Sequence, residues 1–306
     1  MRVLIIRSGA LGDTLMLMPS IVYFNRKEDI LIAGRSPGID YLRPYVKECI
    51  DMERGGWHKI FMEKSGEINS ISIPKPTPNH VISFMNDSTG VVSSNLKTLF
   101  PESRFAAFPP FPPTVEKIHT ALYMAQSLES AGLPINSRTA FDEYLKRPLL
   151  AVTNFSRKGG GIVFHPGSGS KEKNYSKEFW LEMVKYLKQV YDDKSMDYIV
   201  LLGPAEEDLL PFFKKASNEI RIKIIFCPER EELLTVLRQA FLYMGHDSGI
   251  THLAAMTGSP VIALYRRDTD QWSPLGPNLK VIYSEEEKPE ILKEEIFQAM
   301  KSLFLI

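Results

Sequence analysis

Short apolar runs alternate with longer amphipathic stretches along almost the whole chain. The apolar runs are typical of buried strands and cover residues 3–6, 30–33, 80–84, 161–164, 198–202, 223–226, 241–244 and 260–264. The stretches with helical periodicity cover residues 14–24, 115–131, 177–190, 206–216, 231–240, 250–256 and 290–304. Continuous apolar strands separated by helices predict parallel sheets with both faces covered. The pattern therefore predicts an α/β fold built from Rossmann-like domains.

The chain is long enough for two such domains. Its 306 residues favour two domains of about 150 residues each. The periodicity lapses between Leu145 and Gly161, where Lys146-Arg147-Pro148 and the glycines Gly159-Gly160-Gly161 interrupt the pattern. We therefore predict an N-terminal domain of residues 1–150 and a C-terminal domain of residues 151–306.

Two turns that combine glycine with an acid are the strongest candidates for functional loops. The first is Arg7-Ser8-Gly9-Ala10-Leu11-Gly12-Asp13, and the second is Gly245-His246-Asp247-Ser248-Gly249. Each turn follows a predicted strand and opens a predicted helix. Loops of this kind lie at the carboxyl edge of a parallel sheet, where α/β proteins bind ligands. Two such edges predict a cleft between two similar domains.

Composition limits the kinds of binding partner and the cellular environment that we expect for this protein. The 37 basic and 37 acidic residues cancel, which argues against a nucleic-acid binder held by bulk charge. The two cysteines, Cys49 and Cys227, lie far apart and favour a reducing, cytoplasmic environment over a disulfide scaffold. The apolar run after Met1-Arg2 is too short for a signal-peptide core, and no stretch reaches the length of a membrane span.

The first turn has two interpretations. Gly9 and Gly12 allow a sharp turn and the close approach of a ligand, while Asp13 lies at the predicted helix start. An acid at this position often serves only as the N-cap of the helix, and we give this alternative equal weight. The complete G-x-G-x-x-G spacing is absent, so a dinucleotide-binding site is not predicted.

A second candidate loop covers residues 165–175, between a predicted strand and a predicted helix. Its small residues leave backbone N–H groups accessible, Ser168 and Ser170 add hydroxyl donors, and Lys173 adds a positive charge. These groups suit a diphosphate. The spacing is not that of a Walker A loop, and composition alone favours the alternative of an exposed loop with solvated lysines.

The third candidate segment covers residues 246–255. Asp247 or Ser248 can cap the following helix, and Gly249 leaves the first N–H groups open to an anion. His246 and His252 are more typical of packing residues than of site residues. Their spacing is not that of metal ligands, so we expect no metal.

Together, the three segments resemble glycosyltransferase family 9, the ADP-heptose:lipopolysaccharide heptosyltransferases. The similar stretches are RSGALGDTLMLMP (7–19), HPGSGSKEKNY (165–175) and MGHDSGITHLAAMTGSPVIALYRRDTDQWSPL (244–275), and the resemblance extends in order over nearly the whole chain. It implies a GT-B architecture, in which two Rossmann-like domains with parallel sheets face each other across a cleft. The first domain would bind the acceptor and the second the nucleotide sugar, and the last helix often crosses back to the first domain.

The resemblance also implies an activity. It is the inverting, metal-independent transfer of heptose from ADP-heptose to the inner core of lipopolysaccharide, without a cofactor. The partners would be the nucleotide-sugar donor and the lipopolysaccharide acceptor, not a nucleic acid. Such an enzyme would be cytoplasmic and would make peripheral contact with the inner membrane.

Specific positions follow from the resemblance. Asp13 matches the general base of the family. Ser168, Ser170 and Lys173 match its phosphate-contacting loop, and Asp247, Ser248 and Gly249 match its diphosphate-binding helix start. Glu206 stands roughly where the family has an acid for the ribose hydroxyls, although Glu207 is an alternative.

The chain departs from the family pattern at two places. Tyr265-Arg266-Arg267-Asp268-Thr269 follows the strand where the family commonly has a Gly-Pro-Thr turn, and Ser83-Phe84-Met85-Asn86-Asp87 replaces an acid-led motif. These departures keep two alternatives open, a non-catalytic sugar-nucleotide-binding protein and a transferase that uses another nucleotide sugar. Four basic residues of the first domain are candidates for binding an acidic acceptor, with solvated surface positions as the alternative: Arg35, Arg43, Arg54 and Lys59.

Overall fold

The computed structural model describes residues 1–24, 28–63, 65–150, 160–191, 196–267 and 270–304. The chain divides into two compact units. The first consists of Met1–Glu143 with Asp270–Trp272, and the second of Tyr144–Thr269 with Ser273–Ile306. Residues 151–159, where the expected domain boundary and Gly159 fall, lie outside the described residues, as do Asp268 and Thr269.

The first unit contains a five-stranded parallel sheet in the order β3-β2-β1-β4-β5. Its strands are β1 (Arg2–Arg7), β2 (Asp29–Gly34), β3 (Glu48–Asp51), β4 (His80–Ser83) and β5 (Arg104–Ala107). The central strand β1 is buried from Val3 onward because helices cover both faces of the sheet. All pairings are parallel, as the continuous apolar runs predict.

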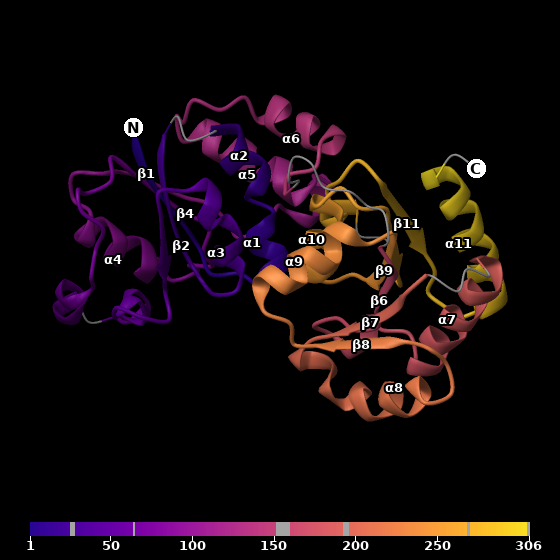
Figure 1. Cartoon of the computed structure of the whole chain (residues 1–306). Helices are drawn as coiled ribbons and strands as arrows, with labels where there is room; N and C mark the ends of the chain where they lie inside the picture. The colour runs from indigo at the N-terminus through magenta and orange to yellow at the C-terminus, as the bar shows by residue number, and fades with distance from the viewer. Residues whose placement is uncertain (25–27, 64, 151–159, 192–195, 268–269, 305–306) are drawn as a thin grey trace. The chain divides into compact units, whose positions relative to one another are not determined.

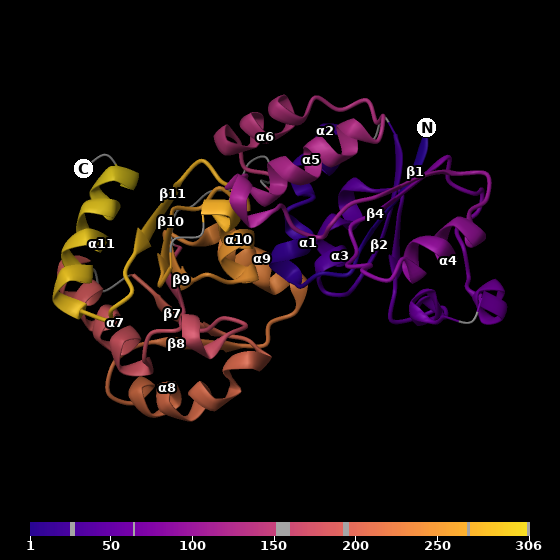
Figure 2. The same ribbon diagram turned by 180° about the vertical axis from the view of Figure 1, so that it is seen from behind.

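Helices on the two sides of this sheet differ in kind. One face packs against α4 (Val91–Leu99) and the 3-10 helices Trp57–Phe61 and Ser65–Ser70, with Trp57 and Leu96 in the shared core. Figures 1 and 2 show the remaining helices on the opposite side. These are α1 (Leu11–Leu15), α2 (Met18–Phe24), α3 (Gly38–Leu42) and α5 (Thr120–Ser130), and α6 (Ser137–Lys146) follows.

The second unit contains a six-stranded parallel sheet in the order β11-β10-β9-β6-β7-β8. Its strands are β6 (Ile162–His165), β7 (Tyr198–Leu202), β8 (Lys223–Phe226), β9 (Leu242–His246), β10 (Val261–Tyr265) and β11 (Leu279–Tyr283). The sheets of both units follow the strand order of the Rossmann fold. The prediction of an α/β fold with two parallel sheets is therefore confirmed.

The helices of the second unit also cover both faces. α7 (Lys177–Tyr191) and α11 (Pro289–Phe304) lie on one side of the sheet, and α9 (Arg230–Gln239) and α10 (Gly249–Met256) lie on the other (Figures 1 and 2). α8 (Leu210–Ser217) packs beside the edge strand β8. The crossing of the last helix to the first domain stays a prediction. Leu292 and Ile296 of α11 join the core formed with α7, because their own sheet offers the apolar surface that they need.

The topology determines where each candidate loop lies. In the first unit the strand order reverses between β1 and β4, and in the second between β6 and β9. Ligands of open α/β sheets bind outside the carboxyl ends of the strands at this switch point. Asp13 follows β1, the loop with Ser168 follows β6, and Asp247 follows β9. All three candidate segments therefore lie at a switch point.

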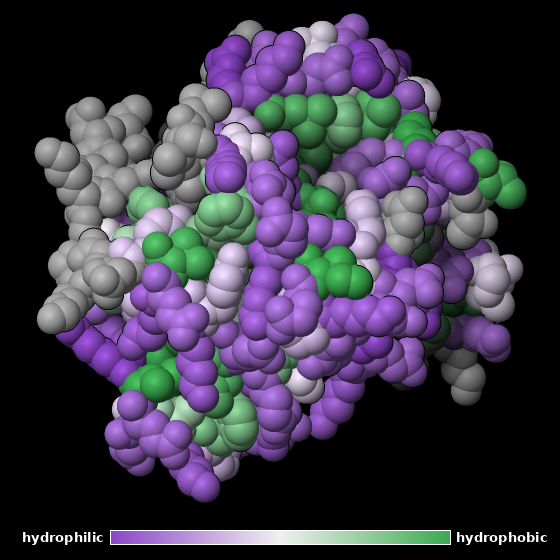
Figure 3. All heavy atoms as spheres, turned by 90° about the vertical axis from the view of Figure 1, so that its right-hand side faces the viewer, coloured by the Kyte–Doolittle hydropathy of each residue, from purple (hydrophilic) through white to green (hydrophobic). Residues whose placement is uncertain are grey.

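Among the described residues, no helix combines the length and apolar character needed to cross a bilayer. On the face drawn in Figure 3, hydrophilic side chains predominate and hydrophobic ones form small separate groups.

Candidate functional site

The first unit presents Asp13 in the turn after β1. Helix α1 begins at Leu11, so Ala10 is the N-cap and Asp13 is the third helical residue. Asp13 is therefore not the N-cap itself, because the helix starts earlier than its apolar pattern indicates, but its side chain does cap the helix start. Its Oδ2 accepts a hydrogen bond from the Ala10 N–H at 3.0 Å. Gly9 makes room for this arrangement, since a Cβ at that position would lie 2.5 Å from Asp13 Cβ.

A buried arginine supports this turn. Arg7 is 1% exposed, and its Nε donates a hydrogen bond to the Asp13 carbonyl at 3.1 Å. Its Nη1 donates to the Pro110 carbonyl at 2.6 Å, and its guanidinium lies over the Phe111 ring. Burial lowers the pKa of Arg7 to about 10, and the Asp13 carboxylate opposes that decrease. Arg7 therefore stays charged at neutral pH and holds the turn that carries Asp13. Sequence reasoning overlooked this role.

The candidate acceptor-binding cations of the first unit are already paired. Exposed ion pairs join Arg35 to Glu53, Arg43 to Asp40 and Arg54 to Asp51, and Lys59 donates to Ser70 Oγ. Exposed pairs of this kind contribute little to stability and exchange readily with solvent.

Asp87, in the altered motif after β4, has a structural role. Its carboxylate oxygens accept from the N–H groups of Val92 and Ser93 at the start of α4, which lowers its pKa although burial opposes this. Asp87 thus anchors a helix start.

In the second unit, the loop after β6 is held together by Ser168. Its hydroxyl lies 2.8 Å from the Ser170 carbonyl and 2.7 Å from Asn174 Oδ1, and it accepts from the Ser170 N–H at 3.3 Å. Ser168 is only 7% exposed. Its hydroxyl therefore orders the loop, while Ser170 and Lys173 remain on the surface of that loop.

In the turn after β9, the two predicted capping residues, Asp247 and Ser248, have different roles. Ser248 is the N-cap of α10, and its Oγ accepts from the Thr251 N–H at 3.3 Å. Asp247 instead forms an ion pair with Lys173, with 2.6 Å between Nζ and Oδ2. Burial raises the pKa of Tyr265, at the end of the neighbouring strand β10, and the Asp247 carboxylate raises it further. The structure thus joins Lys173 of the loop after β6 to the acid that precedes α10.

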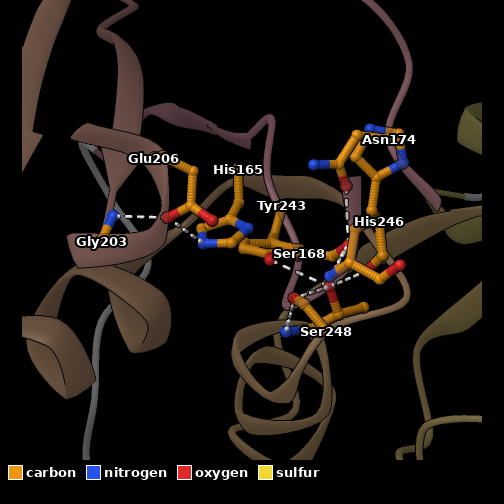
Figure 4. A network of polar contacts seen from close by, with 10 residues as sticks. His165, Ser168, Asn174, Gly203, Glu206, Tyr243, His246 and Ser248 are labelled. Carbon is orange, nitrogen blue, oxygen red and sulfur yellow. Dashed lines mark hydrogen bonds and ion pairs between the residues drawn. The ribbon is translucent and has the colours of Figure 1, made fainter. Parts of the chain in front are cut away.

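Glu206 lies beside Gly203 and His165, as Figure 4 shows. It is 4% exposed, and its Oε2 accepts from the Gly203 N–H at 2.8 Å and lies 3.9 Å from His165 Nε2. Burial raises the pKa of Glu206 and lowers that of His165 to about 4, so this contact does not involve a protonated histidine at neutral pH. Gly167 makes the approach possible, since a Cβ there would lie 2.1 Å from the Glu206 carboxyl. Contact of Glu206 with ribose stays a prediction.

His246 proves to be a central packing residue. It is fully buried, and its Nε2 accepts from the Tyr175 N–H at 2.9 Å and from Trp180 Nε1 at 3.1 Å. Nδ1 must then carry the proton, and it lies 3.4 Å from the Leu264 carbonyl. Burial lowers the pKa of His246 to about 3. The ring therefore joins β9 to the loop after β6 and is not available to a substrate.

A surface hollow gathers several predicted residues of the second unit. It is lined from the carboxyl ends of three strands by Ser170, Glu172, Lys173, Asp247, Tyr265, Arg266 and Arg267. Ser170, Lys173 and Asp247 were predicted, whereas Glu172 and Tyr265 were not. Ser168 and Ser248 support the loops that form it, and Glu206 is not among the lining residues. Within the described ranges, no three histidine, cysteine, aspartate or glutamate side chains gather in a way that could hold a metal ion.

The fold and the hollow together define an α/β protein with a hollow lined by charged residues at the carboxyl edge of its second sheet. Comparison with solved structures identifies the architecture. *E. coli* heptosyltransferase WaaC with ADP is similar with a TM-score of 0.72 at 15% identity, covering 98% of this chain and 100% of that one. The *E. coli* ADP-heptose lps heptosyltransferase II gives 0.68 at 17% identity, with 99% of each chain covered. The expected GT-B-like fold is confirmed.

A third similar structure is the glycosyl transferase family 9 protein from *Veillonella parvula*, with a TM-score of 0.69 at 15% identity, covering 99% of this chain and 97% of that one. No curated protein matches the sequence. The model of glycosyltransferase family 9 (heptosyltransferase) matches residues 68–301. The chain belongs to this family, as the resemblance implied.

Proposed function

We propose that this protein transfers heptose from ADP-heptose to an inner-core lipopolysaccharide acceptor. The observation that carries the proposal is the hollow at the switch point of the second sheet, where Lys173, Asp247 and the start of α10 meet. Family membership supplies the reaction class. Residues 151–306 hold the nucleotide sugar, and residues 1–150 hold the acceptor.

The donor's diphosphate binds in this hollow. Ser170 and Lys173 contact it from the loop after β6, and the N–H groups at Gly249 meet it at the start of α10. Hydrogen bonds of Ser168 and Ser248 stabilise the conformations of these two segments. Asp247 forms an ion pair with Lys173. Glu206 contacts the ribose. Charge on the leaving nucleoside diphosphate is met by these protein groups, so the transfer requires no metal.

Asp13 is the general base on the acceptor side. It deprotonates an acceptor hydroxyl, which attacks the anomeric carbon while the nucleoside diphosphate leaves from the opposite face. One displacement of this kind inverts the anomeric configuration. Arg7 holds the backbone of the turn and so orients the carboxylate.

The proposed acceptor determines where in the cell the enzyme works. A lipid-anchored saccharide is presented at a membrane surface, so the enzyme works in the cytoplasm with peripheral contact to the inner membrane. The exposed cations of the first unit, including Arg35 and Arg54, are candidates for contact with an acidic acceptor.

Calorimetric titration of nucleotides tests the donor assignment. We expect ADP to bind more tightly than UDP or GDP. A clear preference for UDP or GDP would remove ADP-heptose as the donor and leave the transferase class intact. Tight ADP binding without ADP release from ADP-heptose in the presence of acceptor would instead support a non-catalytic binding protein.

A further inference from the structure

Two adjacent arginines after β10 have different surroundings. Arg266 is half-buried and is held in place by the chain itself. Its Nη1 donates to the Asn174 carbonyl at 3.1 Å and its Nη2 to the Glu285 carbonyl at 2.9 Å. The guanidinium also lies over the Tyr175 ring, with 5.6 Å between Cζ and the ring centroid. Arg266 therefore joins the loop after β6 to the segment after β11.

Arg267 differs from Arg266 in its contacts with the described residues. It is exposed and lines the same hollow, yet no hydrogen bond or ion pair joins it to another residue in the described part of the chain. An Arg side chain with an unoccupied planar fork is well suited to bidentate recognition of a phosphate.

The charges of the hollow favour an anion. Lys173, Arg266 and Arg267 oppose Glu172 and Asp247, which leaves an excess of one positive charge. Lys173 is compensated by Asp247 at 2.6 Å. Arg267 is therefore the lining cation that can take up a second anionic group without first giving up a partner among the described residues.

The strand order places Arg267 and Lys173 on opposite sides of β9. β9 lies between β10 and β6 in the sheet. Arg267 follows β10 and Lys173 follows β6, so they approach the Asp247 turn from its two sides. A ligand with two linked phosphates can present one phosphate group to each cation, whereas a monophosphate offers a single group.

We propose that Arg267 is the residue by which this site distinguishes a nucleoside diphosphate from a nucleoside monophosphate. The inference rests on the proposed donor site and adds to it a phosphate contact from the turn after β10. Arg266, its neighbour, supports the wall of the site from behind.

The test is calorimetric binding of ADP and AMP to the full chain and to Arg267→Gln. We expect the substitution to weaken ADP binding about 10- to 100-fold, in the range for hydrogen bonds to charged groups. AMP binding should change less than about threefold. Arg267→Lys should restore part of the ADP affinity, because it returns the charge without the planar fork.

Two variants serve as controls. Lys171→Gln removes an exposed cation of the loop after β6 that pairs with Asp208 outside the hollow, and it should leave ADP affinity unchanged. Arg266→Gln should lower Tm, because it breaks bonds to two backbone carbonyls, while Arg267→Gln should not.

The outcomes are distinct. Wild-type ADP affinity in Arg267→Gln, or equal losses for ADP and AMP, would overturn the assignment of Arg267 while the donor site stands. A wild-type protein that binds ADP no better than AMP would overturn the proposed donor site and this inference together.

Discussion

Asp13 is the residue on which the proposed chemistry depends most. Asp13→Asn keeps an oxygen that can accept from the Ala10 N–H, so we expect little change in Tm. The amide cannot act as a base, and kcat should fall by about 100-fold or more, the lower range for general-base catalysis. Steady-state kinetics with melting curves measured in parallel test this.

A matched control for Asp13→Asn is Asp142→Asn, which changes another helical acid of the first unit that pairs with Arg138 on the surface. It should retain wild-type turnover. Near-normal kcat in Asp13→Asn would show that the carboxylate only closes the helix start.

The buried histidines make stability depend on pH. Burial lowers the pKa of His246 to about 3 and that of His165 to about 4 in the folded chain. Below the unfolded value of about 6.5, the unfolded chain binds protons that the folded chain does not. Stability is therefore complete above that pH and falls as the pH decreases towards these folded values, by up to about 1.4 kcal/mol per pH unit for each histidine.

Denaturant unfolding between pH 7.5 and about 4.5 measures this dependence. His246→Gln should reduce the acid slope, because the Gln oxygen can replace Nε2 as acceptor without titrating. His58→Gln, which changes an exposed histidine, should leave the slope as in the wild type. An unchanged acid slope in His246→Gln would contradict the linkage to His246.

At the scale of elements, Ser248 determines how α10 begins. Ser248→Ala removes the acceptor for the Thr251 N–H, and this should lower the free energy of unfolding by about 1 kcal/mol. The helix start also belongs to the proposed diphosphate site, so ADP affinity should fall in the same variant. Ser88→Ala, which changes an exposed loop serine, is the matched control. Equal stability of the two variants would mean that the cap contributes nothing.

The sequence predicts the central strands of the described sheets, but of their edge strands it predicts only β8. Residues 30–33 and 198–202 form continuous apolar runs because both faces of those strands are covered. β3, β5 and β11 were missed, since they lie at sheet edges and their partly exposed residues break the run. Helix ends were also misjudged: the predicted helix over 115–131 is divided at Lys117, which has a φ of 46°.

Prediction of the candidate site from local sequence is limited in a similar way. Glycine combined with an acid found the loops after β1 and β9, and small residues with serines and Lys173 found the loop after β6, because such turns have local sequence features. The ion pair of Lys173 with Asp247 and the burial of His246 depend on residues 74 and 71 positions apart. Contacts of this range arise from strand order, which local patterns do not encode. The separate roles of Arg266 and Arg267 could not be distinguished for the same reason.

At the scale of the whole molecule, two units each carry a Rossmann-type strand order with candidate residues at the switch point. The fold is similar to that of WaaC at 15% identity. The fold is retained because apolar strand positions accept many residue types. Donor and acceptor specificity depend on a few side chains, so they must be tested directly.

Release of ADP from ADP-heptose, measured with and without a heptose-deficient lipopolysaccharide acceptor, tests the central claim most directly. We predict acceptor-dependent ADP release, with a heptosylated product of inverted anomeric configuration and a rate that a chelator leaves unchanged. ADP-heptose that binds without acceptor-dependent release, or turnover only with a different nucleotide sugar, would contradict the account.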